Sequence, residues 1–189
     1  GPDALGRIGE HLAQGAPVAA VHLIAHGEPG ALLLGGERLD ADGVEAAADT
    51  LSAWATSLTT DADLLLYGCD LASREDGLAL IARLAALTGA DVAASDDPTG
   101  AATLGRDWTL EVAVGSIEAR LFGASSADAA LASWQHTLGD VTVSTTADIV
   151  DGDTSSIGAL IATPGADGSI SLREAVLAAG AAPDADVIT

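Results

Sequence analysis

Short apolar runs alternate with segments of helical periodicity over the first half of the chain. Three apolar runs are typical of buried strands: residues 17–25, 62–68 and 90–95. Apolar positions recur at helical spacing in three further segments: residues 3–15, 41–58 and 75–88. This order of helices and strands is typical of right-handed crossovers in a parallel sheet covered on both faces. The pattern therefore predicts an α/β fold.

Residues with capping and turn chemistry mark the limits of these elements. Asp40 or Asp42 is placed to cap the second helix, and Gly89 is placed to end the third. Gly35–Gly36 predicts a two-residue turn in a hairpin within residues 31–40. The chain is therefore expected to carry a hairpin between the first strand and the second helix.

The pattern changes near residue 139. A hairpin within residues 107–122 and a helix near 126–135 are expected to complete a first domain at residues 1–138. The remaining segment, 139–189, has short β-prone stretches around one helix at about 171–179 and ends on an apolar "DVIT". Because a single strand is not stable alone, we expect the natural protein to continue with more strands.

Composition and charge narrow the function classes. The chain has 189 residues, 49% of them apolar but only five aromatic, which is typical of a globular domain with an aliphatic core. Seven basic residues, all arginine, oppose 28 acidic ones, and the net charge of −21 argues against nucleic acid as a partner. No apolar run approaches the roughly 20 residues of a membrane span, so we expect none in this fragment.

Two reactive residues follow apolar runs. His26 comes after the first predicted strand and Cys69, the only cysteine, after the second. Since carboxyl ends of neighbouring parallel strands meet at one rim, the imidazole is expected near the thiol, where it could generate a nucleophilic thiolate. Gly27 and Gly68 allow close backbone approach, and the Gly27 and Cys69 amides are candidates for an oxyanion hole.

Four stretches carry a family resemblance: "HLIAHGEPGALLLG", "LLLYGCDLA", "GADVAASDDPTGA" and "DWTLEVAVG". They resemble the bacterial domain DUF4347, and the order His-Gly then Gly-Cys is similar to caspase-like cysteine peptidases. The resemblance implies a caspase-like three-layer sandwich with a mainly parallel sheet, with His26 as general base and Cys69 as nucleophile. It also implies an extracellular or cell-surface bacterial protein, and an amino-terminal strand that is missing here.

The stretch "DGSISLREAVLAA" in the second segment resembles the CSLREA-type segment that precedes parallel β-helices. The resemblance implies a small α+β segment leading into a β-helix. The same region has the second half of an EF-hand-like loop, with Asp167 and Glu174 at ligand positions and Asp151 and Asp153 in a neighbouring loop. These four residues are candidate calcium ligands. The alternative is a plain helix start.

Acidic residues lie close to the predicted thiol site. Asp96 and Asp97 follow the third strand, on the rim where a specificity pocket would select a basic residue before the scissile bond. The alternative is that "DDPTG" is ordinary turn chemistry. Asp70 follows Cys69 directly, and its negative charge would oppose thiolate formation.

Two functions follow from this reading. The first is a caspase-like cysteine endopeptidase module that acts on a polypeptide, including its own parent chain, and needs no cofactor for the chemistry. The second is a catalytically inactive scaffold that serves as the folding, secretion or adhesion module of a β-helix surface protein. The paired glycines favour the enzyme, whereas Asp70 and the missing strand favour the scaffold.

Overall fold

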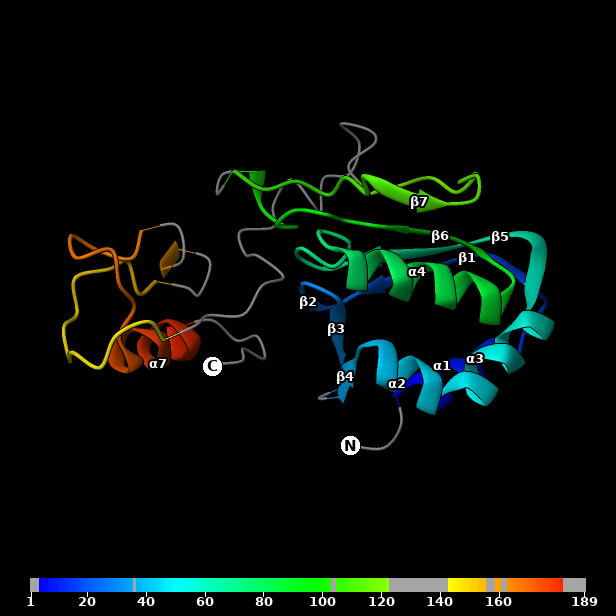
Figure 1. The fold of residues 1–189 in the computed structure, drawn as a ribbon, viewed down its shortest axis with the longest axis horizontal. Coiled ribbons are helices and arrows are strands. Elements are labelled where there is room, and N and C mark those ends of the chain that lie inside the picture. Colours follow the sequence, from blue (N-terminus) through cyan, green and yellow to red (C-terminus); the bar gives the residue numbers. More distant parts are fainter. Residues whose placement is uncertain are drawn as a thin grey trace.

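The structure is a computed structural model that describes residues 4–35, 37–102, 105–122, 143–155, 159–160 and 163–181. These residues form a mixed α/β unit with a mainly parallel sheet, and a smaller C-terminal segment built around one helix (Figure 1). The helix expected near residues 126–135 and the final "DVIT" stretch lie outside the described residues.

The main sheet has the strand order β1-β5-β6-β7. Its strands are β1 (Val18–Ile24), β5 (Leu58–Tyr67), β6 (Asp91–Ala94) and β7 (Val112–Val114). The first three strands run parallel, and β7 is antiparallel to β6. The parallel sheet predicted from the alternating pattern is confirmed, and the carboxyl ends of β1 and β5 lie side by side.

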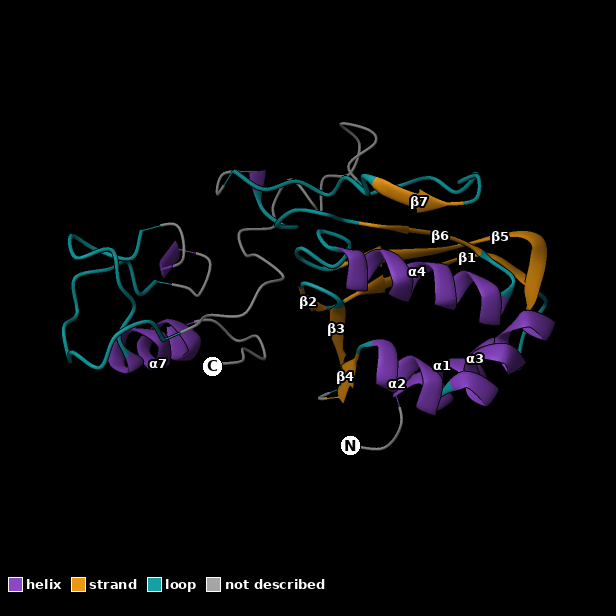
Figure 2. Ribbon diagram, in the orientation of Figure 1, coloured by secondary structure: helices purple, strands orange, loops and turns teal. Residues whose placement is uncertain are grey.

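The helices of this unit pack on one face of the main sheet (Figure 2). They are α1 (Ala4–Leu12), α2 (Ala41–Ala46), α3 (Ala48–Trp54), the short 3-10 helix η1 (Ala55–Ser57) and α4 (Glu75–Thr88). Leu64 and Leu66 of β5 point into the same buried cluster as Leu51 and Leu80 from these helices. The connections from β1 to β5 and from β5 to β6 both step in the same direction across the sheet. Because such connections are right-handed, their helices lie on the same face.

The opposite face carries a second cluster, formed by Leu65 and Tyr67 of β5 with Ala93 of β6. Trp108 packs there, together with the partly buried residues of segment 117–122. In the described part of the chain this face is therefore covered by extended chain, whereas the sequence pattern predicted helices on both faces.

A second, three-stranded antiparallel sheet follows β1. Its strands are β2 (His26–Glu28), β3 (Ala31–Leu34) and β4 (Glu37–Leu39). Leu34 pairs with Glu37, so β3 and β4 form the predicted antiparallel hairpin. Strand β2 was not predicted, because three residues are too few to show an alternating pattern. His26 thus lies inside a strand of the small sheet and not in a loop.

Two predicted elements differ from those observed. The helix expected over 41–58 is divided into α2 and α3 at Ala47, with Asp40 capping α2 by accepting the Gly43 amide at 3.0 Å. The hairpin expected within 107–122 has only β7 among the described residues. The amides after β7 are bound by carboxylates of β5 and β6 and are not available to a further strand.

The C-terminal segment is organised by α7 (Leu172–Ala181). Ala175 and Ala178 of this helix pack on Leu160 in a small cluster, and Thr145 forms a bridge with Ser171. The helix predicted at about 171–179 is confirmed. No described helix is long and apolar enough to cross a membrane.

The carboxylate of Glu174 connects the parts of this segment by hydrogen bonds. Glu174 is buried, with 1% of the residue exposed. One oxygen accepts the backbone amide and the hydroxyl of Ser171 at 2.8 and 2.9 Å, and the Glu174 amide lies 3.3 Å from that hydroxyl, which makes a capping box. The other oxygen accepts the amides of Asp151 and Gly152 at 2.9 and 2.8 Å. These bonds, the Ser171 amide first, lower the pKa of Glu174 to about 2.

We predict that acid loosens the C-terminal segment through Glu174. Its folded pKa of about 2 lies below the usual 4.5, so its stabilising effect is complete above pH 4.5 and is lost as the pH falls toward 2. The protection factors of the Asp151 and Gly152 amides, which are obtained from exchange rates measured by NMR and corrected for the intrinsic effect of pH, should fall over that range. Glu174→Gln should show the low protection already at pH 7.

The matched control for that experiment is Asp153→Asn, which removes one charge from an exposed turn of the same segment. It should leave the exchange of the Asp151 and Gly152 amides unchanged. Equal acceleration in both variants would contradict the role assigned to Glu174.

Candidate functional site

The two strand ends that carry His26 and Cys69 meet through their backbones. The register of β1 and β5 ends with Ile24 opposite Tyr67, and the Ala25 amide donates to the Tyr67 carbonyl at 3.1 Å. The next residues leave both strands at the same edge of the sheet. The predicted juxtaposition of the strand ends is therefore observed.

Gly27 lies directly against the Gly68–Cys69 peptide. A Cβ built on Gly27 would lie 2.4 Å from the Gly68 carbonyl carbon and 2.5 Å from the Cys69 nitrogen, closer than any real Cβ contact. A Cβ on Gly68 would lie 3.2 Å from the Gly27 Cα. Gly27 is thus needed because the Gly68–Cys69 backbone occupies the space of a side chain, whereas a Cβ on Gly68 would first meet Leu32 Cδ2, at 2.5 Å.

The Cys69 thiol is buried, with the residue 3% exposed. Its Sγ accepts a hydrogen bond from the Thr99 amide at 3.2 Å and donates one to the Thr99 carbonyl at 3.4 Å. Thr99 belongs to the loop after β6, so the third parallel strand also contributes to this rim. The bond from the Thr99 amide can be made to the thiol or to the thiolate, whereas the bond to the Thr99 carbonyl requires the S–H of the neutral thiol.

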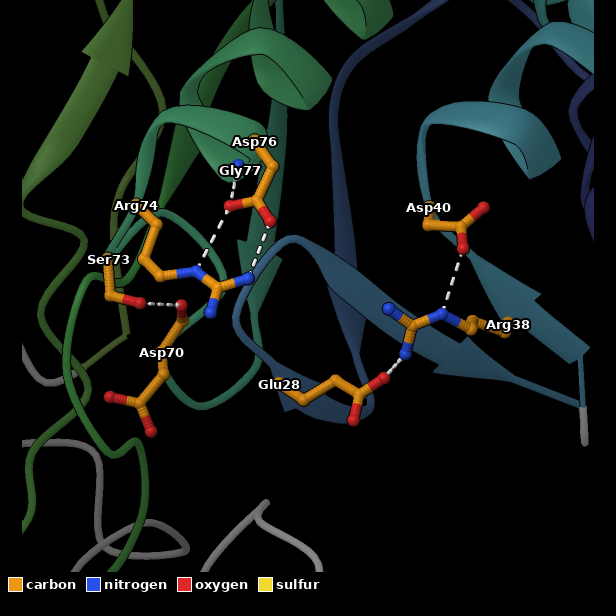
Figure 3. A network of polar contacts seen from close by, with 8 residues as sticks. All are labelled: Glu28, Arg38, Asp40, Asp70, Ser73, Arg74, Asp76 and Gly77. Carbon is orange, nitrogen blue, oxygen red and sulfur yellow. Dashed lines mark hydrogen bonds and ion pairs between the residues drawn. The ribbon is translucent and has the colours of Figure 1, made fainter.

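The chain turns sharply after Cys69. Asp70 has φ of 56°, the one positive value among the described non-glycine residues. Its amide donates to the Asp97 carbonyl at 2.9 Å, and its own carbonyl accepts the Ser73 hydroxyl at 2.6 Å (Figure 3). This conformation costs free energy for a residue with a side chain, although aspartate tolerates it better than most. The turn aims the chain away from the sheet immediately after the thiol.

The start of α4 locks this turn to the small sheet. Asp76 is paired with Arg74 and accepts the Gly77 amide (Figure 3). A Cβ on Gly30 would lie 2.8 Å from the Asp76 carboxylate carbon. The Gly30 amide also donates to the carbonyl of Leu71 at 3.1 Å. The β2–β3 turn and the loop after Cys69 are thus held against each other.

The carboxylate of Glu28, two residues after His26, forms an ion pair with Arg38 of β4 (Figure 3). Arg38 also donates to Asp40, the cap of α2, at 2.8 Å. All three groups are partly exposed, so the pairs contribute little to stability. They link β2, β4 and α2 on the surface beside the thiol site.

The rim beside Cys69 is acidic. Burial raises the pKa of Asp70, an effect that Arg106 opposes and Asp96 reinforces. The pKa of Asp97 is also raised, by burial first and then by Glu111 and its other acidic neighbours. The predicted specificity residues, Asp96 and Asp97, therefore lie in one negative region with Asp70.

The predicted calcium ligands are used in local hydrogen bonds. Glu174 binds backbone amides as described, and Asp151 accepts the amide of Ala166 at 2.8 Å. Asp153 and Asp167 each accept the amide two residues later in the chain. The calcium site in this segment stays a prediction. The capping signal of Glu174, serine three residues before glutamate ahead of an apolar run, was present in the sequence but was not used.

Carboxylates lie close enough together to bind a metal ion in two other places within the described chain. Among the described residues, two groups of three have ligand atoms within 4.8 Å of one another: Asp63 with Asp91 and Glu118, and Asp97 with Asp107 and Glu111. Sequence reasoning missed the first group, although an aspartate inside the apolar run of β5 was a usable signal.

The fold and the strand-end site define an α/β domain in which a histidine and a cysteine follow the carboxyl ends of two adjacent parallel strands. The chain belongs to the family described as Domain of unknown function (DUF4347), whose family profile matches residues 1–138. Comparison with curated proteins found no match, and comparison with solved structures found none either.

We predict that Gly27→Ala both destabilises the protein and disturbs the thiol site. The new methyl group would overlap backbone atoms of Gly68 and Cys69, which cannot move aside as a side chain can. Overpacking of this kind costs about 1–3 kcal/mol in the free energy of unfolding, measured by urea denaturation. Gly15→Ala is the control, because a Cβ there meets nothing within 4 Å. Equal stability of the two variants would contradict the close backbone contact.

Proposed function

We propose that the domain is a caspase-like cysteine endopeptidase module, with Cys69 as nucleophile and His26 as its base. The observation that carries this proposal is the contact of Gly27 with the Gly68–Cys69 peptide, because it brings the backbones that bear the two groups to one point. His26 precedes Gly27 and Cys69 follows Gly68, so this contact supports an imidazole placed near the thiol, as an activated nucleophile requires.

In the proposed reaction, the Cys69 thiolate attacks the carbonyl carbon of a peptide bond. The imidazolium of His26, which took the thiol proton, returns a proton to the departing amine as the C–N bond breaks. Water then hydrolyses the thioester, and the thiol is restored. The amides of Gly27 and Cys69 are the proposed donors to the oxyanion.

The acidic rim suggests the substrate class. Asp96 and Asp97, with Asp70, would favour a basic residue before the scissile bond, through charge complementarity. The proposed substrate is a polypeptide, including the parent chain of a large extracellular or cell-surface bacterial protein with adhesin-like β-helical repeats. This context rests on the resemblance of the domain and of the CSLREA-type segment.

A specific observation favours the second function, an inactive scaffold. Cys69 is 3% exposed, and its Sγ is bonded on both sides to the Thr99 backbone. A buried cysteine of this kind is often only a small apolar side chain. On this reading, the thiol fills the junction of β5 and β6, and the domain serves folding, secretion or adhesion.

The pH dependence of Cys69 alkylation separates the two functions. If His26 activates the thiol, iodoacetamide should react with Cys69 at a pH below 7, and His26→Ala should move the reaction to the range of a free thiol, with a pKa near 8.5. His11→Ala, an exposed histidine on α1, is the matched control and should change nothing. The rate is measured by mass spectrometry.

Two results would contradict the peptidase proposal. One is a thiol that stays unreactive over the whole pH range in the folded protein. The other is the same pH profile in the wild type and in His26→Ala. Either result would support the scaffold, because Cys69 would then behave as a buried structural residue.

A separate prediction concerns Asp70. Asp70→Asn removes the negative charge next to Cys69 while keeping a residue type that tolerates positive φ. The alkylation midpoint should therefore fall by roughly half to one pH unit, since a nearby like charge disfavours the thiolate. Asp61→Asn, an exposed residue of β5, gives the same change in net charge and should leave the midpoint in place. A rise of the midpoint in Asp70→Asn would refute the charge argument.

A further inference from the structure

A group of three carboxylates lies at the other end of the main sheet from the thiol site. Asp63 of β5 pairs in register with Asp91, the first residue of β6, so their side chains leave neighbouring parallel strands on the same face. Glu118 follows β7. One oxygen of each residue lies within 4.8 Å of the other two.

The hydrogen bonds of the described residues leave one buried oxygen of this group without a donor. Asp63 Oδ2 accepts the amides of Glu118 and Ala119 at 3.1 and 2.7 Å, and Asp91 Oδ2 accepts the Ser116 amide at 3.0 Å. Asp63 is 1% exposed, and its Oδ1 is buried without a hydrogen bond from the described residues. A buried carboxylate oxygen with no donor is costly unless a ligand satisfies it.

His22 of β1 lies on the same face of the sheet as Asp63, where it stacks on Tyr67 at a ring distance of 5.9 Å.

The loop after β7 is shaped around the two aspartates. A Cβ on Gly115, which has φ of +92°, would lie 1.9 Å from Asp91 Oδ1. The loop therefore follows the Asp91 carboxylate at a distance that only glycine allows. The backbone of this loop brings Glu118 over the sheet edge, where its exposed carboxylate completes the group.

We propose that Asp63, Asp91 and Glu118 bind one calcium ion. Three carboxylates are hard oxygen ligands, which suit calcium and magnesium and not the metals that prefer nitrogen or sulfur. Calcium accepts six to eight oxygens in irregular geometry, so a mixed set of one buried, one half-buried and one exposed carboxylate, completed by water, suits it better than the strict octahedron of magnesium. The ion joins β5, β6 and the loop after β7, and it supplies the unused Asp63 oxygen with a partner.

The test is a calorimetric titration of the metal-free full chain with calcium chloride at fixed ionic strength. Saturable binding is expected, and Glu118→Gln and Asp91→Asn should weaken it by roughly ten-fold or more. Glu118 is exposed and binds through its side chain, so its variant folds even if a change at Asp63 does not. Magnesium chloride in a parallel titration should bind more weakly.

The matched controls come from the other acidic group and from the C-terminal segment. Asp107→Asn and Glu111→Gln remove the same charge from a group of three exposed carboxylates, and Asp167→Asn does so near α7. Their calcium affinity should stay within about two-fold of the wild type. The proposal is overturned by an absence of saturable binding, by equal losses in all variants, by a loss confined to Asp167→Asn, or by tighter binding of magnesium.

Discussion

The contact between Gly27 and the Gly68–Cys69 peptide is the constraint on which the strand-end site depends. At this point β1 leaves the main sheet and becomes β2 of the small sheet, and β5 ends in the turn at Asp70. A glycine stands at both changes of direction: a Cβ on Gly27 would overlap the Gly68–Cys69 backbone, and a Cβ on Gly68 would overlap the Leu32 side chain. Because backbone cannot yield as a side chain does, the position of each strand end fixes that of the other.

Hydrogen bonds between loops extend this constraint to the third strand. The loop after β6 binds the loop after β5 through three pairs: Thr99 with Cys69, Asp97 with Asp70, and Ser95 with Ala72. The β2–β3 turn and the start of α4 close the arrangement from the other side. A thiol held by fixed backbone groups suits a catalytic nucleophile, and it equally suits a buried structural side chain. The two proposed functions therefore differ in whether a substrate can reach Cys69 and whether His26 can take its proton.

Carboxylates that bind backbone amides are a second recurring device. Asp63, Asp91 and Glu174 each accept amides from a loop that comes from elsewhere in the chain. The protein has a net charge of −21, so its carboxylates repel one another. Amide dipoles offset this repulsion at all three residues, and the proposed calcium ion would offset it at Asp63 and Asp91. Because Asp63 and Asp91 bind the amides of residues 116, 118 and 119, this segment follows the sheet without forming a strand. Glu174, a predicted calcium ligand, likewise binds backbone amides at the start of α7.

The sequence by itself determined the three parallel strands and the helical segments between them, a helix cap at Asp40 or Asp42, the end of α4 at Gly89, and the position of His26 and Cys69 after two neighbouring strands. Each of these follows from periodicity or from turn chemistry within a few residues. The tertiary structure alone decided that all the described helices of the first unit share one face, that Thr99 binds Cys69 Sγ, and that Asp63 meets Glu118. Those contacts join residues 30 and 55 positions apart, and local patterns carry no information about such partners.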